Sequence, residues 1–221
     1  MNTFDTTAPI AAVIDVPAGR VQVIAADRAN ATVEVRPADA GKGRDVKAAE
    51  QTTVEFRDGV LHVQAPPARH QVLGPSGSVE VTVQLPAGSK VTAKAAAAEF
   101  RAVGRLGDVA FDGAHGTVKV DEAASLKLTA HVGDVVVGRL TGPAEISTAK
   151  GDIRIAEAAA GAVVLSTQAG NIEVGAARGV SASLDAGTGL GRIDNSLKND
   201  GAADLDIRAT TGYGDITARS L

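Results

Sequence analysis

One twelve-residue pattern occurs three times in this 221-residue chain, and it limits the possible folds more than any other feature. The copies are LKLTAHVGDVVV at 126–137, AEISTAKGDIRI at 144–155 and VVLSTQAGNIEV at 163–174. In each copy, apolar residues alternate on both sides of a glycine, and this period of two is typical of strands with one buried face. The glycine and the Asp or Asn after it indicate a turn, because glycine adopts positive φ at little cost and an Asx side chain hydrogen-bonds nearby backbone.

The spacing of the copies predicts how they pack. Gly133, Gly151 and Gly170 are 18 and 19 residues apart. Two short strands cannot bury their apolar face alone, but stacked copies can, so a fixed period of this length indicates a solenoid. Like positions in successive copies should then lie above one another at the strand spacing of about 4.8 Å.

Stacking makes definite predictions about individual side chains. The hydroxyls of Thr148 and Thr167 fall on the inward parity beside the turn and are expected to bind backbone groups of the turn. Arg154 should lie over Glu173 as an opposite-charge pair. We call the alternating apolar segment before the glycine turn the first arm of a copy, and the one after the turn its second arm. The outward residues that follow the first arm should form a polar column of Thr129, Ser147 and Ser166.

The glycine turn recurs from residue 107 to the C-terminal residues. We therefore predict an all-β fold, a single-domain parallel β-solenoid resembling a β-helix, with rungs of about 18–20 residues and a more irregular N-terminal β region. We interpret 185–193 and 208–216 as carrying two extra residues before the second arm, which predicts bulges on one side of the stack. The turn residues expected to form a structural ladder are Gly107, Asp108, Gly116, Gly133, Asp134, Gly151, Asp152, Gly170, Asn171, Gly191, Gly214 and Asp215.

We expect one domain at 9–221, with irregular N-terminal rungs or a cap at 9–90, regular rungs at 91–221 and a flexible N-terminus at 1–8. Segment 91–105 has high helix propensity. It also occupies the position of a first arm before the next turn, so we predict a strand there.

Three segments of the N-terminal part lack the regular pattern. Residues 37–49 are polar and are expected to form a loop, with a short helical turn near 46–50. Residues 66–77 combine Pro and Gly without a period, which predicts an exposed loop. Asp58-Gly59 lies between two alternating runs and is a strong signal for a two-residue hairpin.

Composition narrows the function classes. The net charge is -4, which argues against nucleic acid as the main partner. Cysteine is absent, so the chain has no disulfide or thiol chemistry. The first basic residue is Arg20, and no apolar run approaches the roughly 18 residues of a membrane span. We expect a soluble, cytoplasmic protein without membrane insertion.

Three segments carry a family resemblance: SGSVEVTVQLPAGSKV at 76–91, RLGDV at 105–109 and TTGYGDITA at 210–218. With these segments the chain resembles, over about 10–221, the bacterial "putative adhesin" β-strand-repeat family, also called the toastrack domain, and is most similar to its soluble actinobacterial members. The resemblance implies a single-domain β-solenoid. It also implies association with cell-envelope stress systems in members that carry membrane segments or partner domains, and it implies no catalytic residues.

No motif predicts a metal, a cofactor or a catalytic group. Each turn offers one carboxylate, whereas Ca²⁺ takes roughly six to eight oxygen ligands, so the recurring Asp residues are interpreted as turn formers. The Gly-rich segments 188–191 and 211–214 lack the Lys and the following helix of a phosphate loop. The four histidines have no ligand spacing and are expected on the surface: His62, His70, His115 and His131.

These observations favour a non-catalytic structural or protein-interaction module that presents a stiff solenoid surface to an unknown protein partner or to a second copy. Self-association is expected at the solenoid ends, where strand edges are unpaired. A ligand-binding sensor is the alternative, with Thr188 and Tyr213 on the Gly-rich side as its predicted site. A carbohydrate-active enzyme is a third reading, disfavoured because it needs paired carboxylates and sugar-binding aromatics, and the chain has one Tyr and no Trp.

Overall fold

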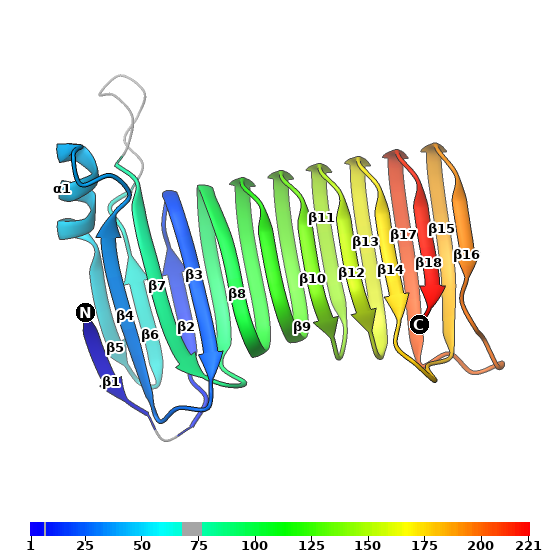
Figure 1. Ribbon diagram of the computed structural model, residues 1–221, viewed down its shortest axis with the longest axis horizontal. Helices are drawn as coiled ribbons and strands as arrows, with labels where there is room; N and C mark the ends of the chain where they lie inside the picture. The colour runs from blue at the N-terminus through cyan, green and yellow to red at the C-terminus, as the bar shows by residue number, and fades with distance from the viewer. Residues whose placement is uncertain (7, 68–76) are drawn as a thin grey trace. The chain divides into compact units, whose positions relative to one another are not determined.

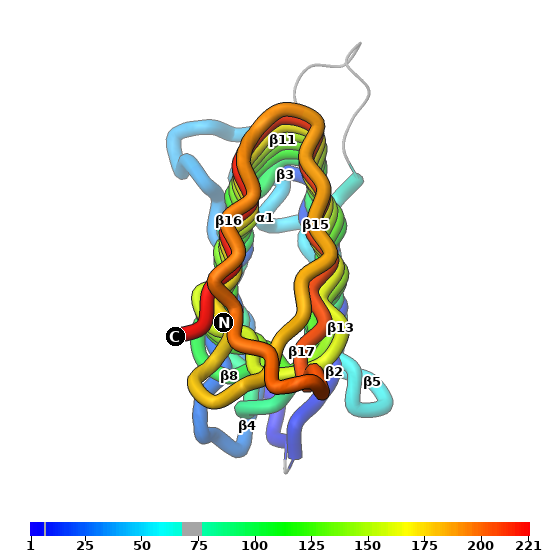
Figure 2. Tube along the Cα trace, turned by 90° about the vertical axis from the view of Figure 1, so that its right-hand side faces the viewer, coloured from blue at the N-terminus to red at the C-terminus, as the bar shows by residue number. Residues whose placement is uncertain are grey.

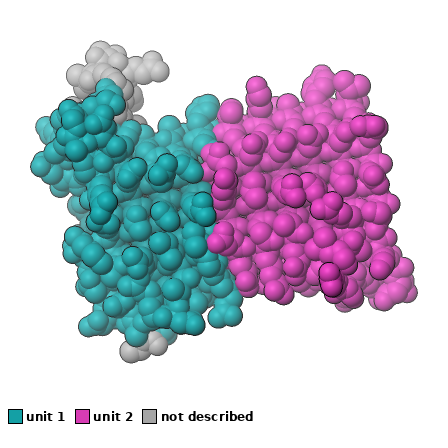
Figure 3. All heavy atoms as spheres, in the orientation of Figure 1, with its two compact units in different colours: residues 1–116 teal, residues 117–221 magenta. Residues whose placement is uncertain are grey.

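The computed structural model describes residues 1–6, 8–67 and 77–221, and strands make up most of this part of the chain (Figure 1). The chain divides into two compact units, Met1–Gly116 and Thr117–Leu221, which are described separately (Figure 3). The predicted division into 9–90 and 91–221 stays a prediction. Most of the loop predicted at 66–77, together with His70, lies outside the described residues.

The first unit contains parallel strands with antiparallel additions at their edges. Strand β2 pairs in parallel with both β6 and β8, and β3 pairs in parallel with both β7 and β8. Strand β4 is antiparallel to β7, β1 to β4, and β5 to β6. The elements are β1 (Asn2–Asp5), β2 (Ala11–Asp15), β3 (Ala18–Ala26), β4 (Asn30–Pro37), α1 (Gly43–Gln51), β5 (Thr53–Arg57), β6 (Val60–Gln64), β7 (Val79–Pro86) and β8 (Lys90–His115).

Two predictions for this unit need correction and one is confirmed. The expected flexible start is wrong for Asn2–Asp5, which form β1 because β4 offers them a hydrogen-bonding edge. The expected short helical turn is a nine-residue helix, α1. Segment 91–105 is strand, as predicted, because its alternate residues, such as Val91, Ala93 and Phe100, are buried against parallel neighbours, and this packing outweighs helix propensity.

The second unit is a regular β-solenoid, as predicted. Its first arms form one parallel stack in the order β9, β11, β13, β17, β15, and its second arms form another in the order β9, β10, β12, β14, β18, β16. Figure 2 shows β15 and β16 as opposing walls of one coil joined by a turn. The strands are β9 (Val118–Val132), β10 (Val135–Leu140), β11 (Ala144–Lys150), β12 (Ile153–Ala158), β13 (Gly161–Ala169), β14 (Ile172–Ala176), β15 (Ala182–Leu190), β16 (Ile193–Ser196), β17 (Leu205–Tyr213) and β18 (Ile216–Ser220).

Aliphatic side chains fill the space between the two walls. In register, Ile146 lies between Leu128 and Leu165, and all three are at most 1% exposed. Burying each such side chain contributes about 1.5–3 kcal/mol relative to leaving it exposed. The narrow interior therefore explains why the chain folds with few aromatic residues.

The order of rungs in space differs from their order in sequence. The last rung of the chain, β17–β18, is inserted between β13–β14 and β15–β16 (Figure 1). Residues 197–204 connect β16 back to this inserted rung. The expectation that every copy lies on the next one is therefore wrong for the last two copies.

The bulges predicted for these copies are also wrong. Thr211 pairs with Thr167, and Tyr213 pairs with Ala169, without a register shift. Strand β15 keeps the same register, with Leu190 opposite Tyr213. The glycines that suggested extra residues, Gly187, Gly189 and Gly212, lie within strands β15 and β17.

Candidate functional site

A ladder of side-chain hydrogen bonds runs along the glycine turns of the second unit. Asp134 Oδ1 accepts the backbone N–H of Asp152 at 3.0 Å, and Asp152 Oδ1 accepts that of Asn171 at 2.7 Å. Asn171 Oδ1 then accepts the N–H of Asp215 at 2.8 Å. Asp215 Oδ1 accepts the N–H of Arg192 at 2.8 Å, which ends the ladder. Each acceptor satisfies the backbone of the next rung, so these Asp and Asn side chains are engaged in holding the scaffold.

The glycines of these turns are required by close packing of consecutive rungs. Gly151 has a φ of 145°, and a Cβ there would collide with the carbonyl oxygen of Gly133. Equivalent collisions would occur at Gly170, Gly191 and Gly214. The backbone approach that lets the ladder form is therefore available only without a side chain at these positions.

A second set of hydrogen bonds lies inside the turns. Thr167 Oγ1 donates to the Gly151 carbonyl at 3.2 Å, as predicted. Thr211 donates to Gly170 O at 2.9 Å and Thr188 to Gly214 O at 3.0 Å. The same prediction is wrong for Thr148, whose buried Oγ1 has no hydrogen-bond partner among the described residues.

The two residues predicted to bind a ligand have different environments. The Thr188 hydroxyl is engaged with the turn backbone. Tyr213 is 66% exposed and lies in register with Leu190, which is 69% exposed. Neither residue lines the hollow described below.

The predicted ladder residues of the first unit lie in a different setting. Gly107 and Asp108 are inside β8, and Asp108 forms an ion pair with Lys90 at 2.8 Å. The hydrogen bond that the Lys90 ammonium donates to Asp108 raises the pKa of Lys90. A Cβ on Gly116 would collide with the Ala98 carbonyl oxygen, which is another close approach between strands.

The outward face of the solenoid carries ordered polar columns. Ser147 lies in register between Thr129 and Ser166, as predicted. Arg154 pairs with Glu173 at 3.3 Å, also as predicted, on the wall formed by the second arms. The other cross-strand pairs in this unit are Lys127–Glu145 at 3.3 Å, Arg139–Glu157 at 3.5 Å and Arg219–Glu173 at 3.2 Å.

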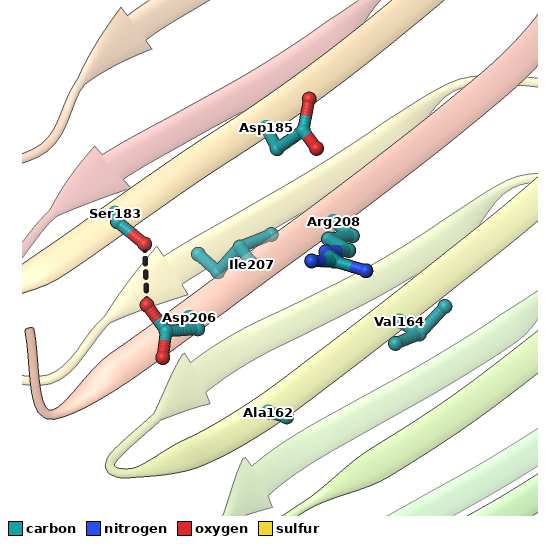
Figure 4. A pocket seen from close by; sticks show the side chains of 7 residues that line it. All are labelled: Ala162, Val164, Ser183, Asp185, Asp206, Ile207 and Arg208. Atoms are coloured by element: carbon teal, nitrogen blue, oxygen red, sulfur yellow. Dashed lines mark hydrogen bonds between the residues drawn. The ribbon is translucent and has the colours of Figure 1, made fainter.

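A shallow hollow interrupts the wall formed by the first arms (Figure 4). Arg208 of β17 lies in register between Val164 of β13 and Asp185 of β15. The Ser183 hydroxyl donates to Asp206 Oδ1 at 2.6 Å. The residues that line the hollow are Ala162, Val164, Ser183, Asp185, Asp206, Ile207 and Arg208.

This hollow was not predicted from the sequence. Its residues come from three separate segments and become neighbours only through the inserted rung. Aligning 207–213 on 163–169 without extra residues would have placed Arg208 opposite Val164, an outward pair without charge complementarity. That mismatch was the available signal.

The described residues contain no group of three or more His, Cys, Asp or Glu side chains that could hold a metal ion. His62, His115 and His131 are exposed, as predicted. The hydrogen bond from the Arg192 backbone lowers the pKa of Asp215.

Residues 12–220 match the family described as Toastrack DUF4097. The chain belongs to this family. Its fold is also that of a putative adhesin from Bacteroides fragilis, with 14% identity, 98% of this chain and 95% of the other covered, and a TM-score of 0.58. A putative adhesin from Parabacteroides distasonis is 14% identical over 98% of this chain and 95% of its own, with a TM-score of 0.49. No curated protein matches the chain significantly.

The toastrack assignment accounts for the solenoid and the glycine turns and names no reaction. The actinobacterial branch suggested by the sequence stays a prediction. Within the described part of the chain, no helix has the length and apolar character needed to cross a membrane.

Proposed function

We propose that this toastrack chain is a non-catalytic, adhesin-like binding module that presents the outer walls of its solenoid to a protein partner. One observation carries the proposal: inward and turn side chains hold the scaffold, whereas outward columns expose polar groups. Ser147, for example, lies between Thr129 and Ser166 on a flat parallel wall. Such a stiff face offers many weak contacts without the cost of ordering a loop.

The family supports this reading in its coarse form. A solved protein with the same fold, from Bacteroides fragilis, is named a putative adhesin. A binding role needs no cluster of titratable groups, and the described residues contain none with metal-ligand character.

Site-specific photo-cross-linking in the native cell tests the proposal. A photoreactive residue at Ser147 or Thr210, both on the wall formed by the first arms, should yield one defined protein adduct. Excess purified chain should compete for that adduct. The matched control position is Lys119, which lies on the wall formed by the second arms. The proposal would be contradicted if a photoreactive residue at Lys119 gave the same amount of the adduct. It would also be contradicted if excess purified chain did not reduce the adduct.

We also propose a cytoplasmic location, which the absence of cysteine supports. Fractionation of the native cell with an antibody to the chain tests it. Recovery in the envelope or secreted fraction would contradict it.

A further inference from the structure

Arg208 differs from the other arginines within strands of the second unit. Arg139, Arg154 and Arg219 each form an ion pair with a glutamate on a neighbouring strand, at 3.2–3.5 Å. Arg208 has no hydrogen bond or ion pair to any residue in the described part of the chain, and its register neighbour on β13 is Val164. A guanidinium normally forms several charge-assisted hydrogen bonds in a rigid fork. Its donors are therefore available to an external group.

The acidic neighbours of Arg208 are held apart from it. Asp206, two residues away on the same strand, has one carboxylate oxygen engaged by the Ser183 hydroxyl at 2.6 Å. Asp185 lies in register with Arg208 on β15, but no ion pair within 4 Å joins them. Figure 4 shows Asp206 turned toward Ser183 and Arg208 between Asp185 and Val164. The hollow thus presents one cation and two anions as separate groups.

An apolar strip borders these charges. Val164 is 42% exposed, and Ala162, on the same strand, is also exposed. Because neighbouring strands are about 4.8 Å apart and alternate residues of one strand are about 6.6 Å apart, the charged and apolar groups fit the size of one small molecule.

We propose that the hollow binds a small zwitterionic group. Its carboxylate or phosphate binds Arg208, its ammonium binds Asp185 and Asp206, and its short alkyl part packs on Val164 and Ala162. A bidentate guanidinium contact is well suited to either anion. The ligand adds no net charge, whereas a simple anion or a simple cation would leave one charge type in the hollow unmatched.

Two sources carry this chemistry: a peptide unit with a free ammonium and carboxylate, and the phosphoethanolamine headgroup of a lipid. The site is open to solvent, so binding of a single unit should be weak, with a Kd of about 1 mM. A surface that presents many copies of the ligand would strengthen it by multivalency. The inference is independent of the protein-binding proposal, because the cross-linked adduct would persist if the hollow were empty.

The test is an NMR titration of the isotopically labelled full-length chain with two probes, glycerophosphoethanolamine and alanyl-alanine. Amide shifts should change at 162–166, 183–187 and 206–210 and saturate. Whichever probe binds more tightly identifies the source. Sodium acetate alone and ethylamine alone should each bind about tenfold more weakly, because each satisfies one charge type only.

Three variants define the site. Arg208→Gln should weaken binding about tenfold, and Asp185→Asn should weaken it by a smaller factor, since a charge-assisted bond becomes a neutral one. Arg154→Gln is the matched control, a strand arginine on the opposite wall that should leave binding unchanged. The amide spectrum of each variant reports its folding, and Arg208→Lys keeps the charge if Arg208→Gln is not folded.

The proposal is overturned if Arg208→Gln, or Arg208→Lys in its place, binds the probes as tightly as the wild type. It is also overturned if acetate or a neutral sugar such as glucose binds equally well, or if neither probe produces saturable shifts at these strands.

Discussion

The two units of the chain hold their strands together in different ways. In Thr117–Leu221, a side-chain acceptor recurs at four glycine turns: Asp134, Asp152, Asn171 and Asp215. In Met1–Gly116, separate buried side chains bind the backbone instead. Ser89 is fully buried, donates to Pro86 O at 2.7 Å and accepts the N–H of Ile10 at 3.1 Å, and the buried Asp45 accepts the N–H of Ser78 at 3.0 Å. A repeated ladder of exposed acceptors in one unit thus contrasts with individual buried clamps, such as Ser89, in the other.

The difference shows how stability is distributed. A ladder divides its contribution among several exposed bonds, so losing one bond has a small effect. A buried clamp concentrates its contribution, because removing it leaves buried backbone groups without partners. The two units share one device, since each contains a rung inserted between others: β2–β3 lies between β6–β7 and β8, and β17–β18 lies between β13–β14 and β15–β16.

The largest effect is expected from Gly151→Ala. Its new Cβ collides with the Gly133 carbonyl oxygen at a φ of 145°, so the free energy of unfolding should fall by about 3 kcal/mol or more. Urea denaturation followed by circular dichroism measures this. Gly59→Ala, in the first unit, places a Cβ with no atom within 4 Å, so its cost comes only from the positive φ of 76°. The free energy of unfolding should fall by about 1 kcal/mol. Gly187→Ala, with open space around it, should be nearly neutral. Equal losses at all three positions would contradict the close-approach argument.

The clamp and the ladder are compared by Ser89→Ala and Asp152→Ala. The first leaves the buried N–H of Ile10 without its partner and should lower the free energy of unfolding by about 2 kcal/mol. The second removes one exposed acceptor and should cost about 1 kcal/mol or less. The same denaturation measurement ranks them, and Asp152→Asn, which keeps an acceptor, is the control. A larger loss at Asp152 than at Ser89 would refute the contrast between clamp and ladder.

The regular part of the fold was predictable because its information is local. Alternation and the glycine turn gave β10 to β14, their parallel register and the Arg154–Glu173 pair. The position of the last rung was not predictable, since Thr167, Thr188 and Thr211 occupy like positions and fit any stacking order. Pairing with β4 similarly made a strand of residues that looked like a loose start.

The candidate binding hollow was hidden for the same reason. Arg208, Asp185 and Val164 belong to three different copies of the repeat, and only the inserted rung makes Arg208 the neighbour of both others. The sequence therefore predicted the scaffold and the outward columns of the regular rungs, such as Thr129, Ser147 and Ser166, but not the surface that the inserted rung creates.

A smaller effect is expected from pH. The backbone N–H of Arg192 holds the pKa of Asp215 below its ordinary value of 3.8, so its folded pKa is lower than its unfolded pKa. Between these two values the unfolded state binds more protons, so this group stabilises the fold above about pH 4, and its contribution is lost as pH falls through the folded pKa. Thermal unfolding can be followed between about pH 6 and about pH 2.5. The melting temperature of Asp215→Asn should fall less steeply with decreasing pH than that of the wild type. A steeper decline in that variant would reverse the sign of the argument.

Changes at the terminal rung, β15–β16, should have the smallest effect on stability. They should instead change how the chain assembles. The ladder ends at Arg192, which cannot accept an N–H and instead reaches back to Asp215 at 3.3 Å. Asn195 on this rung lies in register with Ala218, which in turn lies in register with Val174, so a polar residue occupies an inward position that is apolar on the other two rungs. The Asn195 side chain accepts the N–H of Leu197 at 3.1 Å. Both residues oppose the addition of a further strand, although the unpaired strand edge at such an end predicts association.

The double variant Arg192→Asp/Asn195→Val restores an acceptor and an apolar inward group on the terminal rung. Because an added strand could then continue the ladder, the variant should associate more strongly than the wild type, with stability changed by about 0.5 kcal/mol or less. Sedimentation velocity over a concentration series measures the association. Arg139→Asp, which changes the same charge on a strand that already has neighbours on both sides, is the control. If the wild type associates as strongly as the double variant, and through β15–β16, then Arg192 and Asn195 do not close this end of the solenoid.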